Sequence, residues 1–157
     1  MALYTHRMVS VLVEDLPPAT SDFLHRRARR SGAPSVTDHV RHELITLARE
    51  PDPVDQVVQF IEQNRANPPQ PEIDPDAVVL ADAYRLPPDV WSTLCRRAAA
   101  SHLAVSDYVH GELDRLARHP TIDDSMWELG EIQAADPSLE IDFDEVYQAM
   151  RYARGLD

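Results

Sequence analysis

Residues 86–120 read LPPDVWSTLCRRAAASHLAVSDYVHGELDRLARHP, and this stretch decides the predicted fold. Apolar residues recur at helical spacing over 88–101 and again over 105–118, which predicts two helices joined by a tight turn. The two leading prolines suit a first helical turn, where no backbone hydrogen bond is lost. Pro120 ends the second helix.

An earlier stretch, 16–51, carries the same pattern. Its first part returns 70 residues later and its second part 69 residues later, so one residue is lost in the turn between the helices. Such constant offsets indicate an internal repeat, which determines the architecture. The residues that return are Leu16, Pro17, Pro18, Leu24, Arg26, Arg27, Ala28, Val36, Val40, Glu43, Leu44, Leu47, Ala48 and Pro51.

A short stretch with the period of a half-buried strand precedes each helix pair. Valines alternate with other residues over 8–15, and Val79, Ala81 and Ala83 take the inward positions over 77–85. A single short strand is marginal alone, and one repeat is near the lower size limit for its own core. We therefore predict that the two strands pair antiparallel and that four helices close over one face. This is a mainly α, tandem ribbon-helix-helix fold, an intramolecular pseudo-dimer with additional C-terminal helices and a tail.

The predicted organisation has four parts. Residues 1–51 form the first half, and 52–76 form a short helix and a Pro-rich acidic linker. Residues 77–120 form the second half. Residues 121–157 form acidic, partner-binding helices over 123–133 and 143–154, with a tail.

Charge and composition limit the class of protein that this chain can be. The 157 residues carry a net charge of −12, and residues 120–157 alone carry ten acids against two arginines. The sequence has no run of 18 apolar residues, so it predicts no membrane span. The N-terminus lacks the pattern of a signal peptide. The lone Cys95 fits a reducing compartment. We therefore expect a cytoplasmic protein without membrane contact.

The repeated motifs resemble a known family. Leu-Pro-Pro, Arg-Arg-Ala, Ser-Asp-Tyr-Val, Glu-Leu, Arg-Leu-Ala and Pro, in this order after a strand, are similar to ribbon-helix-helix antitoxins of the VapB (FitA-like) type. The resemblance covers about 16–51 and 86–131. It implies a type II antitoxin that binds and inhibits a PIN-domain ribonuclease toxin, with DNA-binding autorepression as a second role. Further oligomerisation would occur through the toxin.

The resemblance places toxin binding in the C-terminal segment. Family antitoxins often insert an arginine into the acidic metal pocket of the ribonuclease, where a guanidinium grips carboxylates. Arg151 and Arg154 are the candidates here; the alternative is that they offset a helix dipole. Apolar residues would anchor the helices in a partner groove, or else pack on the chain's own core. They are Met126, Trp127, Leu129, Val146 and Met150.

The resemblance also implies a DNA-binding set. Outward strand side chains enter the major groove, and helix N-termini hold phosphates. No outward strand position carries Arg or Lys, and Glu14 and Asp82 repel phosphate, so this role is expected to be the weaker one. The candidates are Arg7, Ser10, Leu12, Ser35, Tyr84, Arg85 and Ser106.

Enzyme signals are not found in the sequence. There is no Gly-rich phosphate loop, nucleophile elbow or cysteine pair, and His39 and His42 lack an evident third metal ligand. We predict no catalytic residue, cofactor or metal. Two other interpretations remain open: a stand-alone transcriptional regulator, and a degenerate protein-interaction scaffold.

Overall fold

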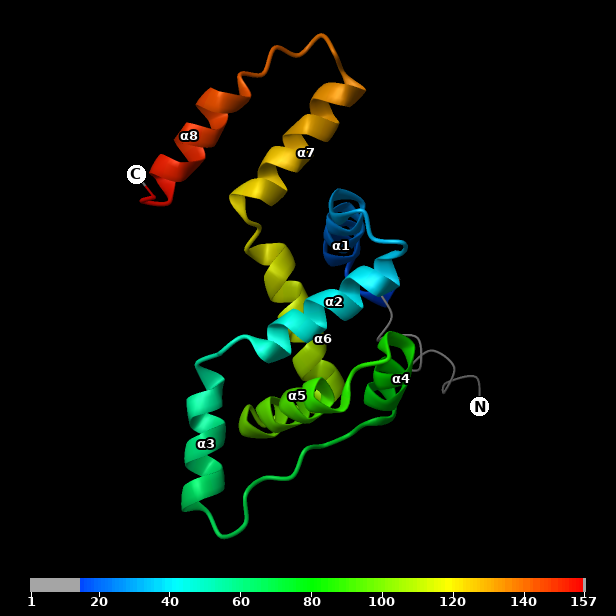
Figure 1. The fold of residues 1–157 in the computed structure, drawn as a ribbon, viewed down its shortest axis with the longest axis vertical. Helices are drawn as coiled ribbons and strands as arrows, with labels where there is room; N and C mark the ends of the chain where they lie inside the picture. Colours follow the sequence, from blue (N-terminus) through cyan, green and yellow to red (C-terminus); the bar gives the residue numbers. More distant parts are fainter. Residues whose placement is uncertain (1–14, 157) are drawn as a thin grey trace. The chain divides into compact units, whose positions relative to one another are not determined.

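A computed structural model describes residues 15–156 of this chain. Over this range the chain forms eight helices and no β-strand (Figure 1). The only sheet-like contact there is an isolated bridge between Glu72 and Ala104. The chain divides into two compact units, with the boundary between Arg115 and Leu116.

The predicted pair of antiparallel strands is wrong, and with it the tandem ribbon-helix-helix fold. The segment predicted as the second strand lies in helix α4 (Pro75–Tyr84). The segment predicted as the first strand, 8–15, lies, apart from its last residue, outside the described residues.

Local sequence explains why this segment is helical. Pro75 stands at the start of α4, where no N–H bond is lost, and its alanines favour helix over strand. Ala77, Leu80 and Tyr84 lie at helical spacing and are all buried. Because nearly every residue from 77 to 84 is apolar, the alternation that suggested a strand carried little information.

The four helices of the repeat are confirmed. They are α1 (Pro18–Ser31), α2 (Val36–Arg49), α5 (Pro88–Ala100) and α6 (Val105–Arg118). Helix α2 lies at the centre of the first unit and contacts α1, α4 and α5 (Figure 1). The apolar core of the first unit contains residues that are at most 1 % exposed: Leu24, Val40, Leu44, Leu80, Tyr84, Val90, Leu94, Val105, Val109 and Leu113.

The helix ends at the turn differ between the two copies. Gly32 adopts the left-handed conformation predicted after α1, and Ser35 accepts the N–H of Asp38 at the start of α2. Helix α6 has Ala104 where α2 has Ser35. A linker carboxylate, Asp74, bonds there instead to the N–H and hydroxyl of Ser106.

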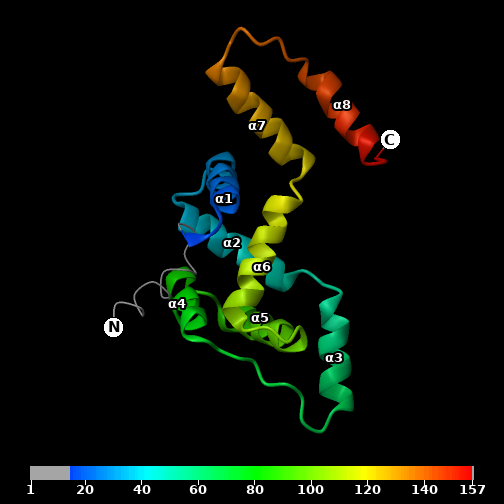
Figure 2. The same cartoon turned by 180° about the vertical axis from the view of Figure 1, so that it is seen from behind.

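The segment between the two copies packs against helices of the second copy. Helix α3 (Val54–Asn64) packs on α5. The linker then returns from the end of α3 to the start of α4 (Figure 2). Three of its prolines line a small hollow with Ala99 and Ala100 of α5; they are Pro68, Pro69 and Pro71. The bridge from Glu72, whose carbonyl accepts the N–H of Val105, positions Asp74 for its capping role.

The second unit contains a hairpin of two helices, α7 (Ile122–Ala135) and α8 (Phe143–Ala153). Thr121 and Asp124 form a capping box at the start of α7, and Asp142 caps α8. None of the eight helices found between residues 15 and 156 is both long and apolar enough to cross a lipid bilayer.

Candidate protein-binding surface

The hairpin of α7 and α8 has apolar faces but no apolar core. Asp124 is the only buried residue in the two helices. Trp127 is 38 % exposed. The other four predicted anchors are half-buried: Met126, Leu129, Val146 and Met150. None of these five residues is fully buried by the chain itself.

The two candidate arginines hydrogen-bond to backbone carbonyls of the hairpin. Arg154 donates to the carbonyl oxygen of Pro120 at 3.0 Å. Arg151 donates to that of Leu156 at 2.7 Å, and its guanidinium lies 5.9 Å from the centre of the Tyr147 ring. Because carboxylates accept from guanidinium more strongly than neutral carbonyls do, a partner carboxylate could replace these bonds.

The charges of α8 are separated along its length. Asp142, Asp144 and Glu145 cap or occupy its first turn, and Arg151 lies in its last turn, followed by Arg154. This distribution complements the helix dipole. The first turn of α8 is therefore acidic and its last turn is basic.

Two of the predicted DNA-binding residues, Tyr84 and Ser106, are buried in the first unit. Tyr84 is 1 % exposed in the core, whereas Arg85, in the left-handed conformation at the end of α4, is exposed. Ser35 caps α2 and is exposed; Ser106 is buried. Arg7, Ser10 and Leu12 lie outside the described residues.

The N-terminus of α6 is already occupied. The N–H groups of Val105 and Ser106 donate to Glu72 and Asp74 at 3.0 and 3.2 Å. A phosphate at this site would have to displace a carboxylate, which disfavours the phosphate-holding role predicted for Ser106.

The comparisons with known proteins do not test the resemblance to antitoxins, which stays a prediction. No family model, curated protein or solved structure matches this chain.

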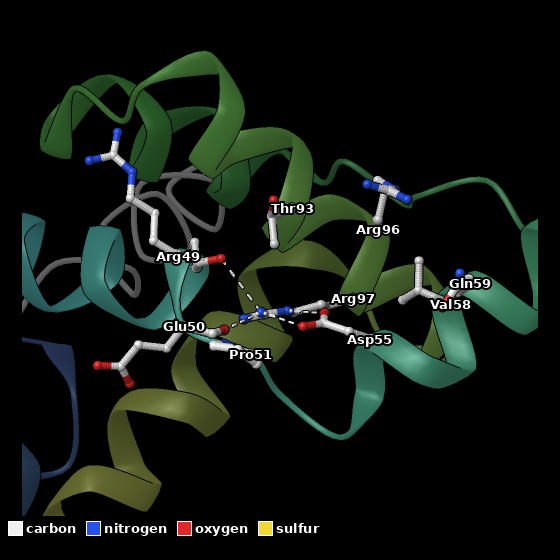
Figure 3. Close-up of a pocket in the computed structure, with 10 residues that line it drawn as sticks. Arg49, Glu50, Pro51, Asp55, Val58, Gln59, Thr93, Arg96 and Arg97 are labelled. Atoms are coloured by element: carbon white, nitrogen blue, oxygen red, sulfur yellow. Dashed lines mark hydrogen bonds and ion pairs between the residues drawn. The ribbon is translucent and has the colours of Figure 1, made fainter.

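A buried arginine, whose role the sequence pattern did not predict, joins three helices of the first unit. Arg97 of α5 is 1 % exposed, and its guanidinium lies between the end of α2 and the start of α3 (Figure 3). It donates to both carboxylate oxygens of Asp55, at 2.8 and 3.0 Å, and to the carbonyls of Leu47 and Glu50, at 3.0 and 2.9 Å. The hydrogen bonds from Arg97 lower the pKa of Asp55. The available sequence signal was that Arg97 repeats Arg27 at the 70-residue offset.

A surface pocket of about 380 Å³ opens above this junction. Three arginines line it, and each holds a carboxylate of the same chain: Arg97 holds Asp55, Arg96 holds Glu62, and Arg49 holds Asp89. The pocket is therefore a structural junction between α2, α3 and α5, and its guanidinium groups are engaged by the protein itself.

A second charged cluster joins α1 and α2. Glu43 accepts from Arg27 at 2.9 Å and lies 3.0 Å from the Nε2 atom of His39. Burial alone would raise the pKa of Glu43, but His39 and the positive charge of Arg27 outweigh burial and hold this pKa below its usual value. Glu43 therefore stabilises the first unit in its ionised form.

Acid should destabilise the first unit through this cluster. The pKa of Glu43 is lower in the folded chain than in the unfolded chain, so its contribution to stability is present above the unfolded value of about 4.5 and is lost as pH falls through the folded value. We expect Glu43→Gln to lower stability at neutral pH and to flatten the loss of stability on acidification. Urea unfolding over a pH series measures both effects. Glu50→Gln, at an exposed position, is the control, and an equal slope in both variants contradicts the assignment.

Two side chains with potentially reactive groups, Cys95 and Tyr108, are buried. Burial raises the pKa of Cys95 to about 11 and is the largest of the effects that raise that of Tyr108 to about 12, so both stay protonated at neutral pH. Between residues 15 and 156, no three His, Cys, Asp or Glu side chains come together as a metal site.

Proposed function

We propose that this chain is a binding protein, not an enzyme, and that its C-terminal hairpin binds and inhibits a partner ribonuclease of the PIN type, as an antitoxin does. The observation that carries the proposal is the hairpin itself. Helix α8 is amphipathic, and neither α7 nor α8 buries an apolar side chain.

A partner would supply the missing core. Two short helices without buried apolar residues have little to offset the entropy of ordering them. Docking of their apolar faces in a groove of another protein would bury Trp127, Val146 and Met150 and stabilise the hairpin. This is the behaviour expected of a segment whose final packing is completed by binding.

Charge favours a nucleic-acid enzyme as that partner. A ribonuclease attracts a polyanion and therefore carries a basic surface, which complements the ten acids of residues 120–157. A metal-dependent ribonuclease also has an acidic pocket within that surface. The separated charges of α8 suit both features, with its acidic first turn at the basic surface and with Arg151 and Arg154 at the pocket.

The site of action we propose is the cytoplasm, where the reduced Cys95 would persist. Operator binding is not part of the proposal, because Tyr84 is buried and the N-terminus of α6 is occupied by Glu72 and Asp74.

Recovery of the full chain from its source cells tests the proposal. We expect a ribonuclease to co-purify in stoichiometric amount, to be inactive in the complex, and to cleave RNA once separated. Recovery of the chain alone or with DNA only, or with a protein that shows no ribonuclease activity after separation, would contradict the proposal.

Substitutions in α8 should separate binding from inhibition. Val146→Asp with Met150→Asp places two charges on the docking face, and we expect affinity for the ribonuclease to fall at least ~100-fold. Arg151→Ala with Arg154→Ala should leave a complex that cleaves RNA. Ala149→Asp, at an exposed position of α8, is the matched control and should bind normally. Equal affinities for the Val146/Met150 variant and the control would remove this face from the interface.

A further inference from the structure

The pocket at the junction of α2, α3 and α5 is rich in arginine, although the chain as a whole is acidic. Three of the 15 arginines line it, against two of the 27 acids. Its volume of about 380 Å³ lies within the range of small-molecule sites, roughly 300–1,000 Å³. Apolar side chains also line it: Ala48, Pro51 and Val58. The pocket therefore has the size and the mixed lining of a site for a small organic anion.

Arg97 neutralises the groups at the base of the pocket that would repel an anion. Backbone carbonyls at the end of a helix carry partial negative charge. Those of Leu47 and Glu50 accept hydrogen bonds from Arg97, and the same guanidinium holds the carboxylate of Asp55. The side chain of Glu50 points away from Arg97 (Figure 3). The base of the pocket is therefore close to neutral, and its positive charge comes from the other two arginines.

The other two arginines are held by carboxylates that do not themselves line the pocket. Glu62 accepts two hydrogen bonds from Arg96, at 2.7 and 2.9 Å. Arg49 donates to Asp89 only through Nε, at 3.4 Å, and within residues 15–156 its terminal amino groups make no hydrogen bond. The side chains of Arg49 and Asp89 are 58 % and 63 % exposed, and exposed ion pairs of this kind are weak. An incoming anion can therefore compete for Arg49.

Competition with these carboxylates determines the charge that the ligand needs. A second carboxylate would gain nothing over the one already present. A phosphate monoester carries a charge of about −1.5 to −2 at neutral pH and offers three strong acceptor oxygens. Guanidinium groups bind phosphate through pairs of parallel N–H donors. The resident carboxylates therefore favour a phosphate ligand over a carboxylate ligand.

We propose that this pocket binds a small phosphate monoester. Its phosphate is held by Arg49 and Arg96, which stand on either side of Thr93 in Figure 3. Its organic group packs against Pro51 and Val58. This inference is independent of the proposed ribonuclease partner, because every residue that lines the pocket belongs to the first unit.

An NMR titration of the ¹⁵N-labelled full chain with phenyl phosphate tests the inference. We expect saturable shifts at the Gln59 side-chain amide, which lines the pocket, with a Kd below about 1 mM. Inorganic phosphate lacks the organic group and benzoate lacks the second charge, so each should bind at least ~10-fold more weakly. Shifts that do not saturate by ~10 mM phenyl phosphate, or equal affinities for phenyl phosphate and benzoate, would overturn the proposal.

Three variants locate the phosphate within the pocket. Arg49→Gln should weaken the binding of phenyl phosphate at least ~10-fold. Arg29→Gln removes the same charge at an exposed position of α1 and should leave binding unchanged. Asp89→Asn releases Arg49 and should tighten binding several-fold, a gain that a purely structural role of Arg49 does not predict. Equal effects of Arg49→Gln and Arg29→Gln, or an affinity that Asp89→Asn leaves unchanged, would contradict the assignment.

Discussion

Replacement of Arg97 by alanine should lower the free energy of unfolding of the first unit by about 3–5 kcal/mol. The substitution leaves the carboxylate of Asp55 without its bidentate partner and removes the donors for the carbonyls of Leu47 and Glu50. Unpartnered buried acceptors carry a large desolvation cost. Because the Asp55 side chain is 42 % exposed and can regain water, the effect should lie toward the lower end of that range.

The neighbouring arginine is the matched control. Arg96 also makes two bonds to one carboxylate, at 2.7 and 2.9 Å, but its side chain is 53 % exposed. Arg96→Ala should therefore cost less than about 1 kcal/mol. Arg97→Lys keeps the charge but not the planar set of donors, so its effect should be intermediate.

Fluorescence can report on the first unit alone. Trp91 lies in α5 and Trp127 lies in α7, so the substitution Trp127→Phe leaves one tryptophan in the first unit. Urea unfolding followed at Trp91 then gives the stability of that unit for each variant. Equal losses for Arg96→Ala and Arg97→Ala would show that the junction seen at Arg97 does not stabilise the fold.

Leu80→Ala should destabilise the first unit by about 2–5 kcal/mol, because it removes a fully buried side chain from a packed core. Val78→Ala, on the exposed side of α4, should change stability by less than about 0.5 kcal/mol. The pair also tests the secondary structure. On a strand, residues 78 and 80 would share one face and respond alike, whereas on α4 only Leu80 faces the core.

Val79→Ala completes this test. The predicted strand placed Val79 inward together with Ala81 and Ala83, whereas in α4 the position is only half-buried. A loss at Val79 that matches or exceeds the loss at Leu80 would favour the strand over the helix. Urea unfolding followed at Trp91 again provides the measurement.

Much of the helical structure could be predicted from residues alone. Pro18 and Pro88 mark helix starts, Gly32 marks a helix end, and Ser35 supplies a cap, and the structure has each feature where local rules place it. The amphipathic hairpin that carries the candidate binding surface was predictable for the same reason. What local rules could not predict was whether its apolar faces are covered.

The failure at residues 77–84 has a physical cause. A segment that is apolar on nearly every side matches both the strand and the helix period, so burial pattern cannot choose between them. The alternation of Val79, Ala81 and Ala83 fits a strand. Pro75 and the alanines favour instead the helix in which Ala77, Leu80 and Tyr84 are buried.

The sequence by itself determined the internal repeat, the four helices of the two copies and the acidic, amphipathic C-terminal segment, because each depends on residues close together in the chain. The tertiary structure alone decided that Asp74 caps α6 in place of the missing serine and that Arg97 joins α2 and α3. These features join residues 32 to 50 positions apart. Their energies come from burial and partner geometry, which exist only once distant helices have packed together.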